Sequence, residues 1–180
     1  MRELILGAAR SGKSSLALRR AHDSGRSVIF VATARASDDE MQARILRHRN
    51  ERPSGWRTLE SPVHLARALS QADDRNAFII VDCLTLWLSN VLCDANAGVP
   101  QFNEVAWRQE SSALRDVLPT LQADIVLVSN EVGWGIVPEN PVARRFRDEQ
   151  GRLNQMLATL CETVSLVVAG LPLTLKSTRG

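Results

Sequence analysis

Eight consecutive residues near the start of the sequence have the types and spacing that bind nucleotide phosphates. They follow a short apolar run, precede a helical pattern and match G-x-x-x-x-G-K-S: Gly7, Ala8, Ala9, Arg10, Ser11, Gly12, Lys13 and Ser14. Glycines let the backbone wrap closely around phosphate oxygens, while successive N–H groups and the following helix N-terminus point at the anion. The lysine brings positive charge to the β- and γ-phosphates, and the serine hydroxyl is a ligand for Mg²⁺. We predict a loop that binds a nucleoside triphosphate.

The lysine of this loop is unusual for a chain that otherwise uses arginine. Lys13 and Lys176 are the only lysines among 22 basic residues. A lysine therefore stands where a phosphate-binding loop needs one, although the chain uses arginine by default. We assign Lys13 a catalytic role, in which its compact charge stabilises the phosphates during transfer.

A carboxylate follows another strand-like run. Residues 78–81 are apolar and end at Asp82. In nucleotide-hydrolysing folds a carboxylate at this place orients a magnesium ion or its water. An aspartate at a strand end also occurs as a plain turn residue, so the run alone is a weak indication. Together with the loop at 7–14, it predicts that Ser14 and Asp82 bind Mg²⁺.

The third candidate group is His48, in a segment with a helical pattern over residues 38–50. Met41, Ile45 and His48 recur at helical spacing, so we expect the imidazole to face the body of the protein. Neutral imidazole is a competent nucleophile toward phosphorus near neutral pH. Spacing alone leaves two interpretations open: a nucleophile, and a half-buried histidine held by a hydrogen bond.

The elements that must position these groups alternate along the chain. Short β-branched runs predict strands over residues 3–6, 28–32, 78–81, 125–128 and 164–168. Helices are predicted over residues 14–21, 38–50, 61–72, 104–118 and 141–160, and loops around 53–56 and 96–100. Strands that are apolar on both faces and separated by helices indicate an α/β fold, a mostly parallel sheet with helices on both faces.

A parallel sheet of this kind binds its ligands at the carboxyl ends of the strands. The loop at 7–14 and Asp82 both stand at such ends. Asn130 and Glu131 come just after the strand predicted over 125–128. We therefore expect these two residues to contact substrate or to order a water of the metal site.

Composition limits the class of protein. The chain has 180 residues, 44% hydrophobic and 23% charged, a balance typical of one globular domain over residues 1–180. The net charge is only +2 and the charges are interspersed, so no nucleic-acid partner is expected. The three cysteines lack C-x-x-C spacing and no apolar run is long enough to span a bilayer. We therefore expect a cytoplasmic protein without stable membrane insertion.

Taken in order, these motifs resemble those of the bifunctional adenosylcobinamide kinase / adenosylcobinamide-phosphate guanylyltransferases of cobalamin biosynthesis. The resemblance covers essentially the whole chain, through segments at 7–14, 39–56, 81–85, 129–140, 144–155 and 167–172. The run SNEVGWGIVPEN at 129–140 is its most specific part. Three positions depart from the pattern: Trp134 replaces the more usual methionine, Ala8 a frequent glycine, and Arg47 a second histidine found in some members.

The resemblance implies a RecA-like P-loop NTPase fold and a two-step activity. First, the γ-phosphate of ATP or GTP passes to the hydroxyl of the aminopropanol arm of adenosylcobinamide. Second, a histidine, here His48, attacks the α-phosphate of GTP, and the guanylyl group then passes to adenosylcobinamide-phosphate to give adenosylcobinamide-GDP. The implied partners are these corrinoids, ATP or GTP with Mg²⁺, and further copies of the chain in a dimer or trimer. Besides the loop and Asp82, the residues that line the nucleotide by family position are Ala32, Thr33, Ala34, Arg49, Asn50, Glu51, Arg52 and Glu60.

Three other functions remain open from the residues alone. A plain P-loop kinase would use Lys13, Ser14 and Asp82 and leave His48 structural. A DNA-associated ATPase of RecA type would need a basic channel, and the even charge distribution argues against one. A nucleotide-gated switch protein that selects guanine would carry N-K-x-D, which is absent because neither lysine follows an asparagine.

Overall fold

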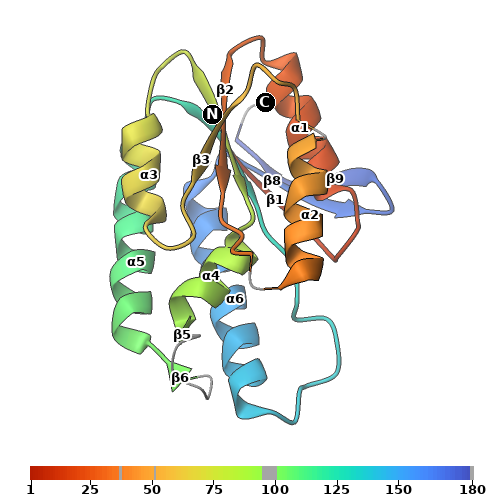
Figure 1. The fold of residues 1–180 in the computed structure, drawn as a ribbon, viewed down its shortest axis with the longest axis vertical. Helices are drawn as coiled ribbons and strands as arrows, with labels where there is room; N and C mark the ends of the chain where they lie inside the picture. The colour runs from red at the N-terminus through yellow and green to blue at the C-terminus, as the bar shows by residue number, and fades with distance from the viewer. Residues whose placement is uncertain (37, 51, 95–100, 179–180) are drawn as a thin grey trace.

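The computed structural model describes residues 1–36, 38–50, 52–94 and 101–178. Its centre is a seven-stranded sheet in the order β3-β2-β4-β7-β1-β8-β9 (Figure 1). The strands are β1 (Arg2–Gly7), β2 (Ser27–Ala32), β3 (Arg57–Glu60), β4 (Ala77–Asp82), β7 (Asp124–Val128), β8 (Thr163–Val168) and β9 (Leu171–Ser177). Neighbouring strands are parallel except for β8 and β9, which pair antiparallel at one edge. The predicted mostly parallel sheet is confirmed.

Helices cover both faces of this sheet, as predicted. On one face, α1 (Lys13–Asp23) lies beside α2 (Asp39–Asn50) (Figure 1). The other face carries α3 (Leu65–Ala72), α4 (Leu84–Leu92), α5 (Glu104–Val117) and α6 (Pro141–Leu160). A short 3-10 turn (Leu118–Thr120) follows α5, and β5 (Cys93–Asp94) pairs with β6 (Gln101–Phe102) after α4.

The central strands are apolar because both of their faces are buried. In β4, Ile79 and Val81 pack into the cluster under α3 to α6, whereas Phe78 and Ile80 pack into the cluster under α1. A strand buried in this way has no polar face, which is why it reads as a continuous apolar run.

The strand order places the predicted chemistry at one edge. β7 lies between β1, which leads into the loop at 7–14, and β4, which ends at Asp82. The register pairs Ile5 with Val128 and Val128 with Asp82 across these three strands. Because the strands are parallel, the residues just after the end of each strand lie at the same edge of the sheet.

Some elements differ from the sequence predictions. The helix predicted over 61–72 begins only at Leu65, because the carbonyl of Val63 accepts the indole N–H of Trp87 (2.6 Å) and the chain turns there. The pattern does not predict α4, because the run LTLWLSNVL is apolar on nearly every side and shows no amphipathic period. It also omits the edge strands β3 and β9, which have little or no buried surface. The loop predicted at 96–100 lies outside the described residues.

The second lysine has a structural function. Lys176 Nζ donates to the carbonyls of Ala158 (2.8 Å), Thr159 (3.3 Å) and Cys161 (2.8 Å), at the end of α6. These carbonyls lack partners within the helix, and a cation there also opposes the negative end of the helix dipole. An ammonium with three donors fits such a cluster of acceptors.

The larger hydrophobic cluster is centred on two tryptophans. Trp87 and Trp107 meet edge to face with ring centroids 5.3 Å apart, and both are at least 95% buried.

Within the described ranges, none of the helices combines the length and apolar character that a bilayer crossing requires.

Candidate nucleotide site

The loop between β1 and α1 can adopt its path only with glycine at two positions. Gly7 has φ +154°, and a Cβ there would lie 2.5 Å from the carbonyl oxygen of Val167 and 2.7 Å from Ser11 Oγ. Gly12 has φ +101° and forms the N-cap of α1, a left-handed conformation that side chains disfavour. The loop is therefore wound tightly between α1 and β8, in the shape that a phosphate-binding loop needs.

Two side chains of the loop are buried with their polar atoms inside it. Lys13 is 6% exposed, and its Nζ donates to the carbonyl of Ala8 (2.6 Å). Ser11 is 9% exposed, and its hydroxyl makes no hydrogen bond to the residues that the structure describes. A buried hydroxyl without a partner costs free energy, and a phosphate oxygen in the loop would satisfy it.

The turn between β8 and β9 supports this loop from outside. The N–H of Gly170 donates to the carbonyl of Ser11 (2.8 Å), and a Cβ on Gly12 would lie 3.1 Å from the Cα of Gly170. Ala169 and Gly170 both have positive φ, 51° and 81°. The sequence predictions do not include these residues in the site; the glycine directly after a buried strand is the signal that could have found them.

Asp82 is a half-buried carboxylate whose charge has no basic partner in the described ranges. Two more deeply buried carboxylates are neutralised: Glu3 pairs with Arg20 (3.2 Å), and Glu149 with Arg145 (3.2 Å). An uncompensated carboxylate at a sheet edge is a suitable ligand for a hard cation. The hydroxyl of Ser14, in the first turn of α1, is also an oxygen donor of the kind that Mg²⁺ prefers, and the joint metal site of Ser14 and Asp82 stays a prediction.

The end of β7 fills the space between the loop and Asp82. The N–H groups of Ser129 and Glu131 donate to the carbonyls of Ile5 (2.9 Å) and Gly7 (3.0 Å). The β1–β7 pairing thus continues beyond the strand into the phosphate-binding loop. Asn130 and Glu131 therefore lie where the sequence places them, and their contact with substrate stays a prediction.

A known protein family matches this chain, including its phosphate-binding loop, Asp82 and the end of β7. The model of the cobinamide kinase / cobinamide phosphate guanyltransferase family matches residues 3–175. The chain belongs to this family. Members of the cobinamide kinase / cobinamide phosphate guanyltransferase family include proteins similar to this chain over nearly its full length.

Two relatives illustrate the similarity. The bifunctional adenosylcobalamin biosynthesis protein CobP of Pseudomonas aeruginosa is 50% identical over 98% of this chain and 98% of its own length. The bifunctional adenosylcobalamin biosynthesis protein CobU of Escherichia coli is 40% identical over 96% and 98% of the two chains.

Solved structures show the fold. The RadB recombinase superposes with a TM-score of 0.52 at 18% identity, over 92% of this chain and 73% of its own. The P4 protein of bacteriophage phi6 superposes with a TM-score of 0.51 at 13% identity, over 99% and 56%. The predicted α/β architecture with a mostly parallel sheet is confirmed.

Family position also assigned Ala32, Thr33 and Ala34 to the nucleotide. These residues end β2 and begin the loop after it. Thr33 is fully buried, and its hydroxyl donates to the carbonyl of Cys83 (2.8 Å). Thr33 thus ties the end of β2 to the residue after Asp82, and its own N–H and carbonyl are bound by Asp82 and Asn90. Its contact with the nucleotide stays a prediction.

The second family-assigned segment ends α2. Arg49 and Asn50 are exposed, and Glu51 lies outside the described residues. The guanidinium of Arg52 stacks over the ring of Phe30, 3.4 Å from its centroid. This cation–π contact attaches the end of α2 to the middle of β2.

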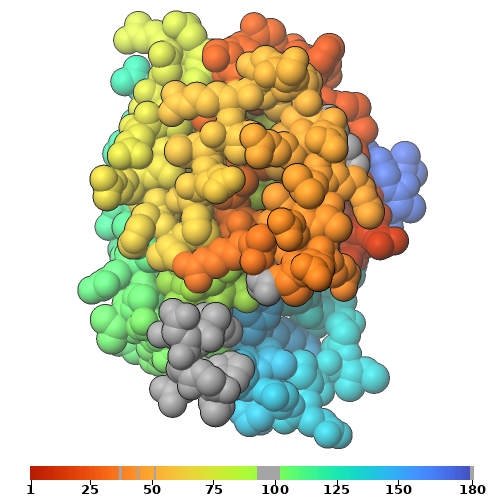
Figure 2. Space-filling view, viewed as in Figure 1, coloured from red at the N-terminus to blue at the C-terminus, as the bar shows by residue number. Residues whose placement is uncertain are grey.

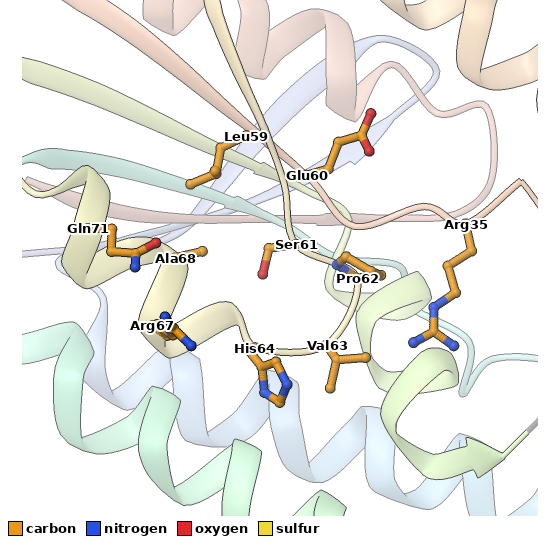
Figure 3. Close-up of a pocket in the computed structure, with 10 residues that line it drawn as sticks. All are labelled: Arg35, Leu59, Glu60, Ser61, Pro62, Val63, His64, Arg67, Ala68 and Gln71. Atoms are coloured by element: carbon orange, nitrogen blue, oxygen red, sulfur yellow. The ribbon is translucent and has the colours of Figure 1, made fainter.

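Glu60, the last family-assigned residue, ends β3 and lines a cavity of about 380 Å³. In the view of Figure 3, Glu60 and Arg35 lie on one side of the loop from Ser61 to His64, and Arg67 and Gln71 of α3 lie on the other. The volume is within the range of small-molecule sites. No local pattern in the sequence predicts this cavity, because its walls come from three separate segments.

His48 has the orientation that its spacing predicts. Among the described side chains of α2, only Met41, Ile45 and His48 are less than exposed, and the rest form much of the surface seen in Figure 2. Both α1 and α2 begin at the carboxyl edge of the sheet and run back toward its amino edge (Figure 1). His48 is nine residues beyond Asp39, about 14 Å along the helix axis. His48 therefore stands in the last turn of α2, and its role as a nucleophile stays a prediction.

Cys83, beside Asp82, is expected to resist alkylation at neutral pH. Burial, and secondarily the charge of Asp82, raise the pKa of its thiol to about 11. A raised pKa leaves the thiol neutral below that value, and only the thiolate reacts. Peptide mapping after iodoacetamide treatment should show a rate that increases about tenfold per pH unit up to about pH 11. Rapid labelling of Cys83 in the folded protein at pH 8 would contradict this environment.

Proposed function

We propose that the protein phosphorylates adenosylcobinamide with ATP or GTP and then transfers GMP from GTP, through a covalent guanylyl-histidine, to give adenosylcobinamide-GDP. One observation carries the proposal: in a member of this family, the phosphate-binding loop and an uncompensated Asp82 stand at the same edge of the sheet. We place the activity in the cytoplasm, in a homo-oligomer.

The backbone of the loop and four side chains hold the triphosphate and its metal ion in this proposal. The backbone of the loop binds the phosphate oxygens, and the ammonium of Lys13 leaves the carbonyl of Ala8 to contact the β- and γ-phosphates. Ser14 and Asp82 hold Mg²⁺, which when bound neutralises charge on the phosphate oxygens. The buried hydroxyl of Ser11 donates to a phosphate oxygen, which gives it the partner that it lacks within the described residues.

The cavity beside β3 is the place that we propose for the guanine base. The Glu60 carboxylate accepts from the N1–H and the exocyclic amine of guanine, a donor pair that adenine lacks. Four strand spacings separate β3 from β1, about 19 Å. A GTP that reached both sites would be extended along the strand ends, past Asp82 and residues 32–34.

His48 is the proposed nucleophile of the second step. A nitrogen of its neutral imidazole bonds to the α-phosphorus, the bond to the bridging oxygen breaks, and pyrophosphate leaves with that electron pair. A phosphate oxygen of adenosylcobinamide-phosphate then attacks the same phosphorus and releases the imidazole. Because the α- and γ-phosphorus atoms react in turn, the proposal includes a movement of α2 between the two steps.

The test is the covalent adduct itself. The protein is incubated with Mg²⁺ and GTP labelled at the α-phosphate and separated on a denaturing gel. We expect acid-labile, alkali-stable label on the wild type, none on His48→Ala, and full labelling of His22→Ala, which changes an exposed histidine at the end of α1. Labelled ATP should give much less adduct, because the proposed base site selects guanine.

A plain P-loop kinase is the second candidate, because the loop with its buried Lys13, and Asp82 at the same edge of the sheet, would suffice for that reaction. In that case a folded wild type that binds GTP would carry no label, and His48→Ala would phosphorylate cobinamide normally. That pair of results would contradict the guanylyl transfer and leave the kinase step in place.

A further inference from the structure

Asn130 lies just after the end of β7. Side chains of two helices, α4 and α6, bind its backbone N–H and its backbone carbonyl. Its N–H donates to Thr85 Oγ1 of α4 (3.0 Å), and its carbonyl accepts from Asn154 Nδ2 of α6 (3.2 Å). The residues on either side of it donate to the carbonyls of Ile5 and Gly7. The backbone of Asn130 therefore has little freedom to move.

A buried polar network lies beneath this residue. Ser129 Oγ donates to Asn154 Oδ1 (2.7 Å), and Gln150 Nε2 donates to Ser129 Oγ (2.9 Å). Gln150 and Ser129 are fully buried, Asn154 is 5% exposed, and Gln150 Oε1 finds no partner among the described residues. Burying polar groups costs desolvation free energy, so this network adds little stability compared with apolar side chains in the same place. Its specific effect is to hold the end of β7 in one position.

The direction of the Asn130 side chain is set by the pleat of β7. Val126 and Val128 pack on the α1 side of the sheet, and Ser129 points to α6 on the opposite side. Because side chains alternate along an extended strand, Asn130 projects to the α1 side. Asp82 is on that side too, since it comes after Val81, which packs under α3 to α6. The carboxamide thus stands between the phosphate-binding loop and Asp82.

The side-chain carboxamide differs from the backbone groups of Asn130, because nothing in the described fold binds it. It is half-buried and makes no hydrogen bond to the residues that the structure describes. The neighbouring Glu131 differs, because its carboxylate accepts from the N–H of Gly133 (3.1 Å) and so closes its own turn. Of the two residues expected at this strand end, the geometry selects the asparagine.

We propose that Asn130 Nδ2 donates a hydrogen bond to a γ-phosphoryl oxygen and stabilises the transition state of the kinase step. The inference rests on the proposed kinase activity and adds a catalytic group to it. In that step the acceptor hydroxyl oxygen bonds to the γ-phosphorus, and its proton passes to water. The bond to the β–γ bridging oxygen breaks, and the electron pair leaves with the nucleoside diphosphate. A rigid, uncharged donor in this place needs no reorganisation as the charge on the γ-phosphoryl oxygens shifts.

The experiment compares the two half-reactions in one variant. Asn130→Ala should lower kcat for phosphorylation of cobinamide by about 100- to 1,000-fold, with a small change in KM for the nucleotide. Formation of the guanylyl adduct at saturating GTP should keep its wild-type rate, because there the α-phosphorus reacts. The adduct rate also shows that the variant is folded and binds GTP.

Asn76→Ala is the matched control, since it removes an exposed carboxamide just before the start of β4, and its kinase rate should be that of the wild type. The proposal is wrong if Asn130→Ala phosphorylates cobinamide normally, or if both half-reactions decrease together with a raised KM. A wild type that forms no adduct contradicts guanylyl transfer instead, and nucleotide protection against thermal unfolding then serves as the folding control for the kinase comparison.

Discussion

Lys13→Met is expected to reduce the rate of cobinamide phosphorylation by about 100- to 1,000-fold, since the ammonium stabilises charge on the transferred phosphoryl group and its leaving group. The side chain is 6% exposed inside the loop, so water cannot replace its charge. Methionine has similar length and apolar character, so the loop should stay packed. Steady-state kinetics with ATP and with GTP measure the effect, and adduct formation should decrease as well because the same phosphates are bound.

The chain offers a matched control in its other lysine. Lys176→Met removes three hydrogen bonds at the end of α6 and should lower the free energy of unfolding by about 1–3 kcal/mol, without changing kcat. Thermal unfolding and kinetics on both variants separate the two roles. Equal loss of activity in both would contradict a specific role for Lys13.

Gly7→Ala should disrupt the loop more severely than any loss of a single ligand. The added Cβ would meet the carbonyl oxygen of Val167 at 2.5 Å, and neither β1 nor β8 can shift without breaking its ladder. We expect a loss of roughly 2–4 kcal/mol in unfolding free energy, a decrease in Tm of roughly 5–15 °C. Nucleotide affinity should decrease at least about tenfold, because the loop can no longer close around phosphate.

Gly55→Ala is the control for this substitution. A Cβ on Gly55 meets nothing within 4 Å, and its backbone does not have the positive φ of Gly7. Differential scanning calorimetry and a nucleotide titration on both variants make the comparison. Wild-type nucleotide affinity in a folded Gly7→Ala protein would show that the loop does not bind phosphate.

The sequence predicted local features well, because their physical causes are local. The loop at 7–14 is set by glycine conformations and a helix start over eight neighbouring residues, and the structure has that strand–loop–helix unit. The inward face of α2 was predicted from helical spacing, and Met41, Ile45 and His48 are its less exposed side chains. Amphipathic helices such as α5 and α6 were predicted to within a residue of their ends.

Elements without a periodic pattern were not predicted. The helix α4 is surrounded by other elements, so it needs no polar face and shows no helical period. The edge strand β9 presents Leu171, Leu173 and Leu175 to the surface, so its residues did not indicate a buried strand. The cavity beside Glu60 is formed by β3, α3 and the loop after β2. A local sequence pattern does not show that these three segments are neighbours in the fold.

By itself, the sequence determined which chemical groups are present: a phosphate-binding loop, a carboxylate at a strand end, a histidine on an inward helix face and a family pattern along the chain. Only the tertiary structure decided which of them meet. Neighbours in a parallel sheet are distant in sequence, so β7 could be placed between β1 and β4 only by the fold. That placement brings Asn130 beside the phosphate-binding loop, because the N–H of the next residue, Glu131, donates to the carbonyl of Gly7.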